Sequence, residues 1–121
     1  MGKKLPEGVA ALNRLFYYYK KDAKRKGRKF ELTREQFERL TKLNCFYCGS
    51  LPSSSMLYEV IEKKLNGDYI YNGIDRIDNN KDYTIDNVVA CCKKCNFMKG
   101  KMEINEFITH VEKIAKRQNI L

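Results

Sequence analysis

Two long stretches of the chain carry hydrophobic residues at helical spacing, one near each end. In residues 8–26 the apolar positions are Val9, Leu12, Leu15, Phe16, Tyr19 and Ala23. Lysines occupy the opposite face and Gly27 follows, so we predict an amphipathic helix that ends at this glycine. In residues 102–121 the apolar positions are Ile104, Phe107, Ile108, Val111, Ile114 and Ala115. Their spacing predicts a second amphipathic helix.

The stretch after Gly27 predicts a short extended piece and then another helix. Residues 29–32 ("KFEL") can be extended, and "TREQ" at 33–36 has the Ser/Thr-x-x-Glu/Gln form of a capping box. We therefore predict a helix from this box to about Leu43. Phe37 and Leu40 would be its inward-facing residues.

Turn and strand signals dominate the middle of the chain. The Asn-Gly pair at 66–67 is a strong hairpin signal, and residues 58–65 and 68–74 would be the two arms. Further on, "NVVAC" at 87–91 is β-branched and apolar, which predicts a strand. The composition of residues 93–100 then turns helical.

Size and composition favour one folded domain with a modest core. The chain has 121 residues, of which 43% are hydrophobic and 32% charged, unlike a disordered tail. No apolar run approaches the roughly 20 residues that cross a bilayer. The start, "MGKKLPEG", lacks the apolar core of a signal peptide. We expect a soluble, cytoplasmic protein with no membrane partner.

Positive charge is concentrated at the N-terminal end. The formal net charge is +9, and residues 1–30 hold ten Lys/Arg against two acids, whereas residues 31–121 hold fourteen against thirteen. Such a block favours contact with a polyanion, of which nucleic acid is the commonest. The same charges would also suit a solvated helix face. The candidate nucleic-acid contacts here are Lys20, Lys21, Lys24, Arg25, Lys26 and Arg28.

Four of the five cysteines form two Cys-x-x-Cys pairs, Cys45 with Cys48 and Cys92 with Cys95. Two residues between ligands let one tight turn aim both sulfurs at one ion, so four thiolates predict a tetrahedral Zn²⁺ site. Four protein ligands leave no position for water, which makes this zinc structural. The alternatives are a redox pair or unrelated core cysteines. Cys91 falls outside the spacing, and we expect it to be a small core residue.

Carboxylate and amide side chains lie between and just after the cysteine pairs. Asp75 falls on the first strand, in "IDRIDNN", and Asn96 falls in the first turn of the helix predicted after Cys92. Because zinc binding would fix the start of that helix, Asp75 and Asn96 could converge on one hard cation. Mg²⁺ suits such a site, since it takes one or two protein oxygens together with water and substrate phosphate.

Taken together, these residues resemble the ββα-metal core of the HNH nuclease family in its zinc-stabilised form. The matching features are the paired Cys-x-x-Cys frame, Asp75 on the first strand, "DNV" with Asn87, and "CKKCNFMKG" with Asn96 at the last motif position. The "IDRIDN" segment is similar to small phage-type members. The basic N-terminal helices and the C-terminal helix extend the resemblance over most of the chain.

The resemblance implies an α+β fold in a single domain of residues 1–121. A basic helical arm (1–44) and a closing C-terminal helix (102–121) would flank a zinc-bound ββα-metal core (45–101). The resemblance also implies DNA as the partner and a catalytic Mg²⁺ or Mn²⁺.

Residue roles follow from the same resemblance. Asp75 and Asn96 would bind the catalytic ion, and Asn87 would brace the loop between the two strands. Lys99 and Lys101 would contact phosphate.

The general base of the family is missing from its usual place. The residue after the metal-binding Asp is a His in the fuller family pattern, and here it is Arg76, which cannot accept a proton but can steady a phosphate. Asp78 is the best remaining candidate, on the same face as residue 76 of an ideal strand. It could be the base, a second metal ligand or a turn cap. His110 is expected on the surface of the C-terminal helix, and Tyr83 is a distant further option.

We therefore expect a metal-dependent DNA endonuclease that hydrolyses phosphodiester bonds with one metal ion. Its catalytic residues would be Asp75, Arg76, Asp78, Asn87 and Asn96. The rival hypothesis is a zinc-stabilised nucleic-acid-binding module that has the fold without the chemistry, and Arg76 is its best support. A protein-interaction domain is the third hypothesis. No motif indicates which DNA sequence would be bound or whether one strand or both would be cut. The biological role and the oligomeric state are likewise not indicated.

Overall fold

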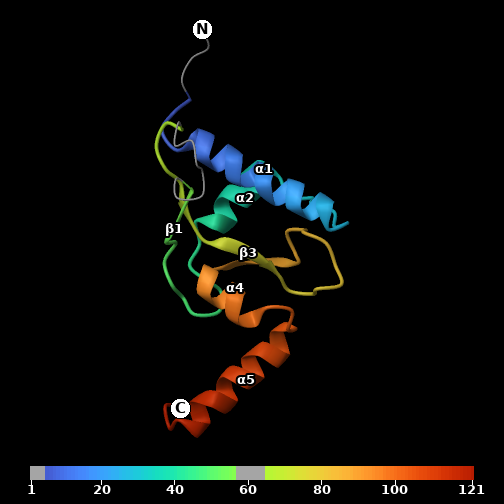
Figure 1. Cartoon of the computed structure of the whole chain (residues 1–121), viewed down its shortest axis with the longest axis vertical. Helices are drawn as coiled ribbons and strands as arrows, with labels where there is room; N and C mark the ends of the chain where they lie inside the picture. Colours follow the sequence, from blue (N-terminus) through green and yellow to red (C-terminus); the bar gives the residue numbers. More distant parts are fainter. Residues whose placement is uncertain (1–4, 57–64) are drawn as a thin grey trace.

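The computed structural model describes residues 5–56 and 65–121, and this described part combines helices with two small antiparallel sheets. In chain order the elements are α1 (Val9–Arg25), α2 (Arg34–Thr41), β1 (Ser54–Ser55), β2 (Ile70–Tyr71), β3 (Gly73–Arg76), β4 (Val88–Cys91), α4 (Lys93–Lys99) and α5 (Ile104–Arg117). Figure 1 shows α1 and α2 on one side of the β3–β4 pair and α4 on the other, with α5 extending away from them. None of the described helices is both long and apolar enough to cross a membrane.

The predicted N-terminal helices are confirmed, together with their end signals. α1 ends at Arg25, and Gly27 beyond it has a φ of 72°, the left-handed geometry that favours glycine. The Thr33 side chain accepts a hydrogen bond from Gln36 N at 3.1 Å, and Gln36 Oε1 accepts one from Thr33 N at 2.9 Å. These two bonds form the capping box of α2 and satisfy backbone N–H groups at the helix start.

The main core forms where α1 and α2 pack on the strands. Phe37 of α2 is fully buried among Phe16 and Tyr19 of α1 and Phe30, with ring centroids 5.3, 5.4 and 6.2 Å away. Such ring contacts add to the free energy of burying the aromatic surface. Other buried members of this core are Leu12, Leu15, Leu32, Leu40, Met56, Tyr69, Tyr71, Ile74 and Val88. The helices and the strands therefore share one hydrophobic core.

The β3–β4 pair carries the candidate site in a fixed register. Asp75 of β3 lies opposite Val89 of β4. Gly73 allows α1 to approach, because a Cβ at this position would lie 2.6 Å from the Tyr19 hydroxyl. That hydroxyl accepts a hydrogen bond from Ile74 N at 3.3 Å. α4 begins one residue after β4, so the predicted order of strand, loop, strand and helix is present.

The loop between β3 and β4 is tied back to the segment after α1. Tyr83 N donates a hydrogen bond to Lys29 O at 3.0 Å, and Glu31 N donates one to Tyr83 O at 2.9 Å. Lys29 N also donates to Asp82 Oδ1 at 2.9 Å. Phe30 and Tyr83 thus form a parallel bridge, with ring centroids 5.6 Å apart. The extended piece predicted after Gly27 is present as the partner of this loop.

A second small sheet precedes the site. β1 and β2 pair antiparallel, with Ser54 opposite Tyr71 and Ser55 opposite Ile70. The first arm of the predicted hairpin, residues 58–65, lies outside the described residues except for its last position.

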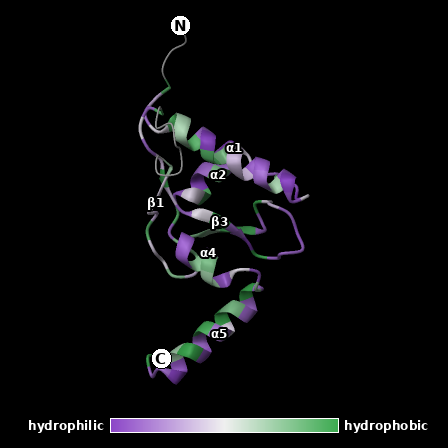
Figure 2. Cartoon of the chain, viewed as in Figure 1, coloured by the Kyte–Doolittle hydropathy of each residue, from purple (hydrophilic) through white to green (hydrophobic). Residues whose placement is uncertain are grey.

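α5 forms as predicted, but it covers the rest of the domain only near its start. Phe107 is buried, and its ring centroid lies 5.4 Å from that of Tyr47. Ile108, Val111 and Ile114 keep 36, 39 and 48% of their surface exposed. Figure 2 shows hydrophobic segments recurring along this helix out to its C-terminal end. The expected closing helix therefore packs against the rest of the domain at Phe107. Its later turns do not, because α5 runs away from the strands (Figure 1).

Phe37→Ala should lower the free energy of unfolding by about 3–5 kcal/mol, because it removes a fully enclosed ring. Leu51→Ala is the matched control: 71% of Leu51 is exposed, so its loss should change stability by less than about 0.5 kcal/mol. Urea unfolding followed by circular dichroism measures both variants. Equal effects of the two substitutions would contradict this description of the core.

Candidate functional site

Four cysteine sulfurs from two distant segments form a compact cluster. The Sγ atoms of Cys45, Cys48, Cys92 and Cys95 all lie within 4.8 Å of one another. Those of Cys48 and Cys92 are 3.7 Å apart. This is close to the edge of about 3.8 Å in a tetrahedron with Zn–S bonds of about 2.3 Å, and far longer than a disulfide bond of about 2.05 Å. The cluster is thus arranged to bind a metal ion, and its donor set is consistent with structural zinc.

Local backbone geometry aims the sulfurs at one another. Phe46 N donates a hydrogen bond to Ala90 O at 2.8 Å, which attaches the first Cys-x-x-Cys turn to β4. Cys92 is the N-cap of α4, where its Sγ accepts a hydrogen bond from Cys95 N at 3.4 Å. Both cysteine pairs are therefore positioned from the end of one strand.

The surroundings of the exposed cysteine favour its thiolate. A hydrogen bond with the Ser50 hydroxyl, 3.0 Å from Cys48 Sγ, lowers the pKa of the Cys48 thiol to about 6. The Cys95 thiol is buried, and this burial raises its pKa. Since thiolates are the metal-binding form of cysteine, a bound cation would supply the charge that stabilises the buried sulfurs.

Cys91 stays outside the cluster, as predicted. It is 1% exposed, and burial raises the pKa of its thiol. None of the described cysteines forms a disulfide. Cys91 is therefore a small core residue next to the cluster.

The first cysteine turn also positions Asp75. The Tyr47 hydroxyl donates a 2.6 Å hydrogen bond to Asp75 Oδ2. Burial, and then the nearby Asp75, raise the pKa of Tyr47, so this hydroxyl keeps its proton. Lys99 Nζ lies 3.2 Å from the same carboxylate oxygen. The hydrogen bond and the ion pair of Asp75 with other described residues both use Oδ2, which leaves Oδ1 for a further partner.

Lys99 is not the phosphate contact that the resemblance implied. Its side chain is 1% exposed, so a phosphate in solvent does not reach the ammonium group. Nζ makes no hydrogen bond of suitable geometry with any described residue. Its charge partner is the carboxylate of Asp75. Because a buried ammonium needs a counter-charge, Lys99 is held by Asp75 and in turn fixes that carboxylate.

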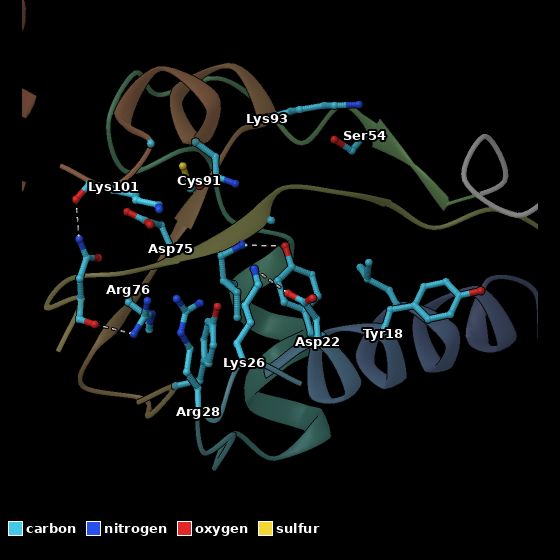
Figure 3. Close-up of a pocket in the computed structure, with 18 of the residues that line it drawn as sticks. Tyr18, Asp22, Lys26, Arg28, Ser54, Asp75, Arg76, Cys91, Lys93 and Lys101 are labelled. Atoms are coloured by element: carbon cyan, nitrogen blue, oxygen red, sulfur yellow. Dashed lines mark hydrogen bonds and ion pairs between the residues drawn. The ribbon is translucent and has the colours of Figure 1, made fainter. Parts of the chain in front are cut away.

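A cleft of about 860 Å³ opens between α1 and the strand that bears Asp75. Asp75 and Asn96, the two predicted ligands of a hard cation, both line it. Its cationic lining residues are Lys26, Arg28, Arg76, Lys93 and Lys101, and its acidic ones are Asp22, Asp75 and Glu103. Figure 3 shows Lys26 and Arg28 entering from the α1 side and Lys93 and Lys101 from the α4 side. The cleft thus presents positive charge on both walls.

Only part of the predicted basic surface faces this cleft. Lys26 and Arg28 line it, whereas four other candidates on α1 are exposed elsewhere: Lys20, Lys21, Lys24 and Arg25. Asp22 pairs with Arg25 at 2.6 Å and with Lys26 at 3.1 Å. The hydrogen bonds from these two cations lower the pKa of Asp22. The acid therefore stays ionised and offsets part of the charge of α1.

Three charged lining residues, Asp22, Lys93 and Glu103, were not among the predicted site residues. The sequence could have indicated Lys93 as a lining residue, because it precedes Asn96 by three positions and residues three apart share a helix face. Nothing in the sequence indicated Glu103. Its position depends on the connection between α4 and α5, which no local pattern specifies.

Arg76 holds the loop as well as lining the cleft. Its Nη1 donates to Asn79 O at 2.8 Å and to Lys81 O at 2.9 Å. Its guanidinium carbon lies 5.5 Å from the centre of the Tyr83 ring. The predicted contact with phosphate is thus left to the remaining guanidinium N–H groups.

Of the three alternatives for Asp78, the geometry favours the turn cap. Its Oδ1 accepts a hydrogen bond from Asn80 N at 2.9 Å. β3 ends at Arg76, so strand alternation does not extend to Asp78, and this residue lies outside the lining of the cleft. A base or a second metal ligand at Asp78 therefore has no support here. His110 is exposed on α5, as expected, and no described histidine lines the cleft.

Asn87 lies at the neck of the loop between β3 and β4. Its side chain is buried, and Oδ1 accepts a hydrogen bond from Asp78 N at 2.9 Å. Its Nδ2 donates to Asp82 O at 2.9 Å and to Asp78 O at 3.2 Å. Asn87 thus joins the two ends of the loop and lies outside the cleft lining, the arrangement expected of a bracing residue.

Two oxygen donors that line the cleft are of the kind that a hard divalent cation binds, but the Lys99 ammonium would oppose such a cation. Asp75 Oδ1 and the Asn96 side-chain carbonyl are ligands of the kind that Mg²⁺ takes with several waters. Lys99 already neutralises much of the charge of Asp75, so a second cation binds this carboxylate less tightly than a lone one. Negative charge from a bound phosphate would restore the balance.

Comparison with known proteins finds a viral relative whose function is not described. Over 97 residues, which are 80% of the chain, the sequence is 37% identical to the uncharacterized protein R423 of Acanthamoeba polyphaga mimivirus. The aligned region is 16% of the length of that protein, so the chain spans a small part of its relative. No protein-family model and no solved structure matches the chain.

Elemental analysis of the purified protein should find about one metal ion per chain, as a four-thiolate site holds a single ion. Cys92→Ala should lose this ion to a chelator that the wild type resists. Cys91→Ala is the matched control, because it removes an adjacent buried thiol outside the cluster. Loss of the ion from both variants, or from neither, would contradict the assignment of the cluster.

Tyr47→Phe should lower the free energy of unfolding by about 1–2 kcal/mol, because a partly solvated carboxylate loses a short hydrogen bond. Its metal content should stay unchanged. Tyr17→Phe, at a position that is 56% exposed, is the control and should be neutral. Urea unfolding with parallel metal analysis distinguishes the two variants. A neutral Tyr47→Phe would show that the hydroxyl does not hold Asp75.

Proposed function

We propose that this protein binds DNA in the cleft and cleaves its phosphodiester bonds in a metal-dependent reaction, as its resemblance to HNH nucleases implies. The observation that carries the proposal is the presence of Asp75 and Asn96 in a cleft that, among the described residues, five cationic side chains also line. Oxygen donors for a hard cation and groups that attract phosphate therefore occur together.

The DNA backbone would run between α1 and α4. Lys26 and Arg28 would contact it from one wall and Lys93 and Lys101 from the other. The exposed lysines further along α1 would raise the positive potential around the entrance and speed the encounter. Contacts with the DNA backbone do not depend on the base sequence, so they would contribute affinity and not sequence specificity.

Asp75 and Asn96 would hold the catalytic ion, Mg²⁺ or Mn²⁺. When bound, this ion would polarise the scissile phosphate and lower the pKa of an attacking water. Tyr47 and Lys99 fix Oδ2 of Asp75, so that Oδ1 is available to the cleft. Arg76 would donate its remaining N–H groups to a phosphate oxygen.

The proton of the attacking water needs an acceptor, and the described cleft holds no histidine. Asp22 is engaged by Arg25 and Lys26. Glu103 is the lining carboxylate that makes no hydrogen bond or ion pair with another described side chain, so it is our candidate acceptor.

The four-cysteine cluster would hold Zn²⁺ in a structural role. Four thiolates complete a tetrahedral shell and leave no position for water. The zinc would fix the turn that carries Tyr47 and the start of α4, and both of these elements position Asp75. Its contribution to cleavage would therefore be indirect.

A second candidate is a zinc-stabilised nucleic-acid-binding module without cleavage. The buried ion pair of Lys99 with Asp75 favours it, because the carboxylate already has a cationic partner. The loop contacts of Arg76, at the position of the family base, favour it as well. Both candidates use the same cationic cleft, so cleavage alone separates them.

Supercoiled plasmid should be cut by the protein in Mg²⁺ or Mn²⁺ and left intact without added divalent ion, while the structural metal is retained. Asp75→Asn and Asn96→Ala should each reduce cleavage by about 10²–10³-fold, because each removes a ligand of the catalytic ion. Asp86→Asn and Asn105→Ala are the matched controls at exposed positions outside the cleft and should keep full activity.

DNA binding is measured in parallel by mobility shift over a range of salt. Lys26→Ala and Lys101→Ala should each weaken binding and lower the salt slope by about one. Salt-dependent binding without cleavage in any metal would reject the nuclease and support the second candidate. Absence of both activities would reject both and leave the protein-interaction hypothesis.

A further inference from the structure

Asn72, the residue between β2 and β3, is buried but belongs neither to the lining of the cleft nor to the cysteine cluster. Its Nδ2 donates a hydrogen bond to Leu43 O at 2.9 Å and another to Ser50 O at 3.2 Å. Its buried Oδ1 accepts no hydrogen bond from any described residue, which costs free energy. The favourable contribution of this amide group therefore comes from the two hydrogen bonds that Nδ2 donates.

The two carbonyls that Asn72 binds lie on either side of the first cysteine turn. Leu43 comes two residues before the turn at 45–48, and Ser50 comes two residues after it. Because both hydrogens belong to one planar amide group, the two ends of the turn are held in a fixed relation to each other. The backbone of Asn72 adds a third bond to the same segment, from its N–H to Thr41 O at 2.9 Å.

Ser50 carries this restraint to both cysteines of the turn. Its carbonyl also accepts a hydrogen bond from Cys45 N at 2.8 Å, and its hydroxyl lies 3.0 Å from Cys48 Sγ. Asn72 itself contacts Ser50 and reaches the two cysteines only through it. Residues one step behind the ligands of a metal ion orient those ligands and raise the affinity for the ion.

We propose that Asn72 is a positioning residue for the metal ion of the four-cysteine cluster. It holds the turn at 45–48 in the geometry for binding, so that less ordering remains to be done when the ion binds. Asn72 also directly precedes Gly73, the first residue of β3. The same amide group therefore attaches the metal-binding turn to the strand that carries Asp75. This role does not rest on the proposed cleavage of DNA.

Two substitutions of Asn72 test the role. Asn72→Leu keeps roughly the size of the side chain without its donors or its unpaired oxygen, and Asn72→Ala removes the whole amide group. Each should lower the affinity of the full chain for Zn²⁺ by about 10–100-fold, measured by competition with a chromophoric chelator. Asn87→Ala is the matched control, because it removes a buried asparagine that also donates two hydrogen bonds to backbone carbonyls, in the loop between β3 and β4. It should lower stability and leave the affinity for Zn²⁺ unchanged.

A second variant tests the route through Ser50 without a change in the core. Ser50→Ala removes only an exposed hydroxyl beside Cys48, and it should lower the affinity for Zn²⁺ by roughly fivefold, the equivalent of one hydrogen bond. Ser53→Ala, at a nearby exposed position, should have no effect. Circular dichroism checks that each variant is folded.

Three outcomes would overturn the proposal. One is wild-type affinity for Zn²⁺ in a folded Asn72 variant, and another is an equal loss of affinity in Asn87→Ala. If neither Asn72 variant folds, Ser50→Ala decides, and wild-type affinity in that variant is the third. Because Zn²⁺ and the chelator are the only probes, a failed cleavage assay leaves these results unaffected.

Discussion

The candidate site depends on one junction, the meeting of the turn at 45–48 with the helix start at 92–95. The described sheets are small, with strands of two or four residues, and the main core lies on the α1–α2 side. On the opposite side the elements meet at the four sulfurs, together with the Phe46–Ala90 hydrogen bond and the contact of Tyr47 with Phe107. Closing a loop of roughly 50 residues carries an entropic cost that a bound metal offsets in small domains. Through this junction Tyr47 meets Asp75, and α4 presents Asn96 to the cleft beside it.

The features that could be predicted from the sequence are those with local causes. The capping box of Thr33, the stop at Gly27 and the cysteine pairs each act within a few residues, and all three are present. The features that could not be predicted have a different origin. Lys99 is buried because of how α4 is turned against β3, and nothing in "NFMKG" shows which face of a helix of about two turns meets a carboxylate. Asp78 could not be placed because the end of β3 is set by contacts from outside the strand.

The molecule separates its charge from its apolar surface. Nearly all of the net positive charge lies in residues 1–30, whereas residues 103–121 are neutral. The first segment provides α1, one wall of the cleft, and the second provides α5, on the far side of α4 (Figure 1). A polyanion and an apolar partner would therefore meet different parts of the chain.

At position 76, the side chain that best holds the loop is not one that can act as a general base. A guanidinium can donate to Asn79 O and Lys81 O together and still lie against the Tyr83 ring, whereas an imidazole offers two divergent nitrogens and cannot bond both carbonyls from one of them. The arginine thus gives a fixed loop where a histidine would give a base. If the cleft cleaves DNA, the loss must be met elsewhere. A divalent ion lowers the pKa of its bound water, and a weak acceptor such as Glu103 then suffices. Under the proposed function, the fixed loop would therefore depend on a metal-activated water to replace the missing base.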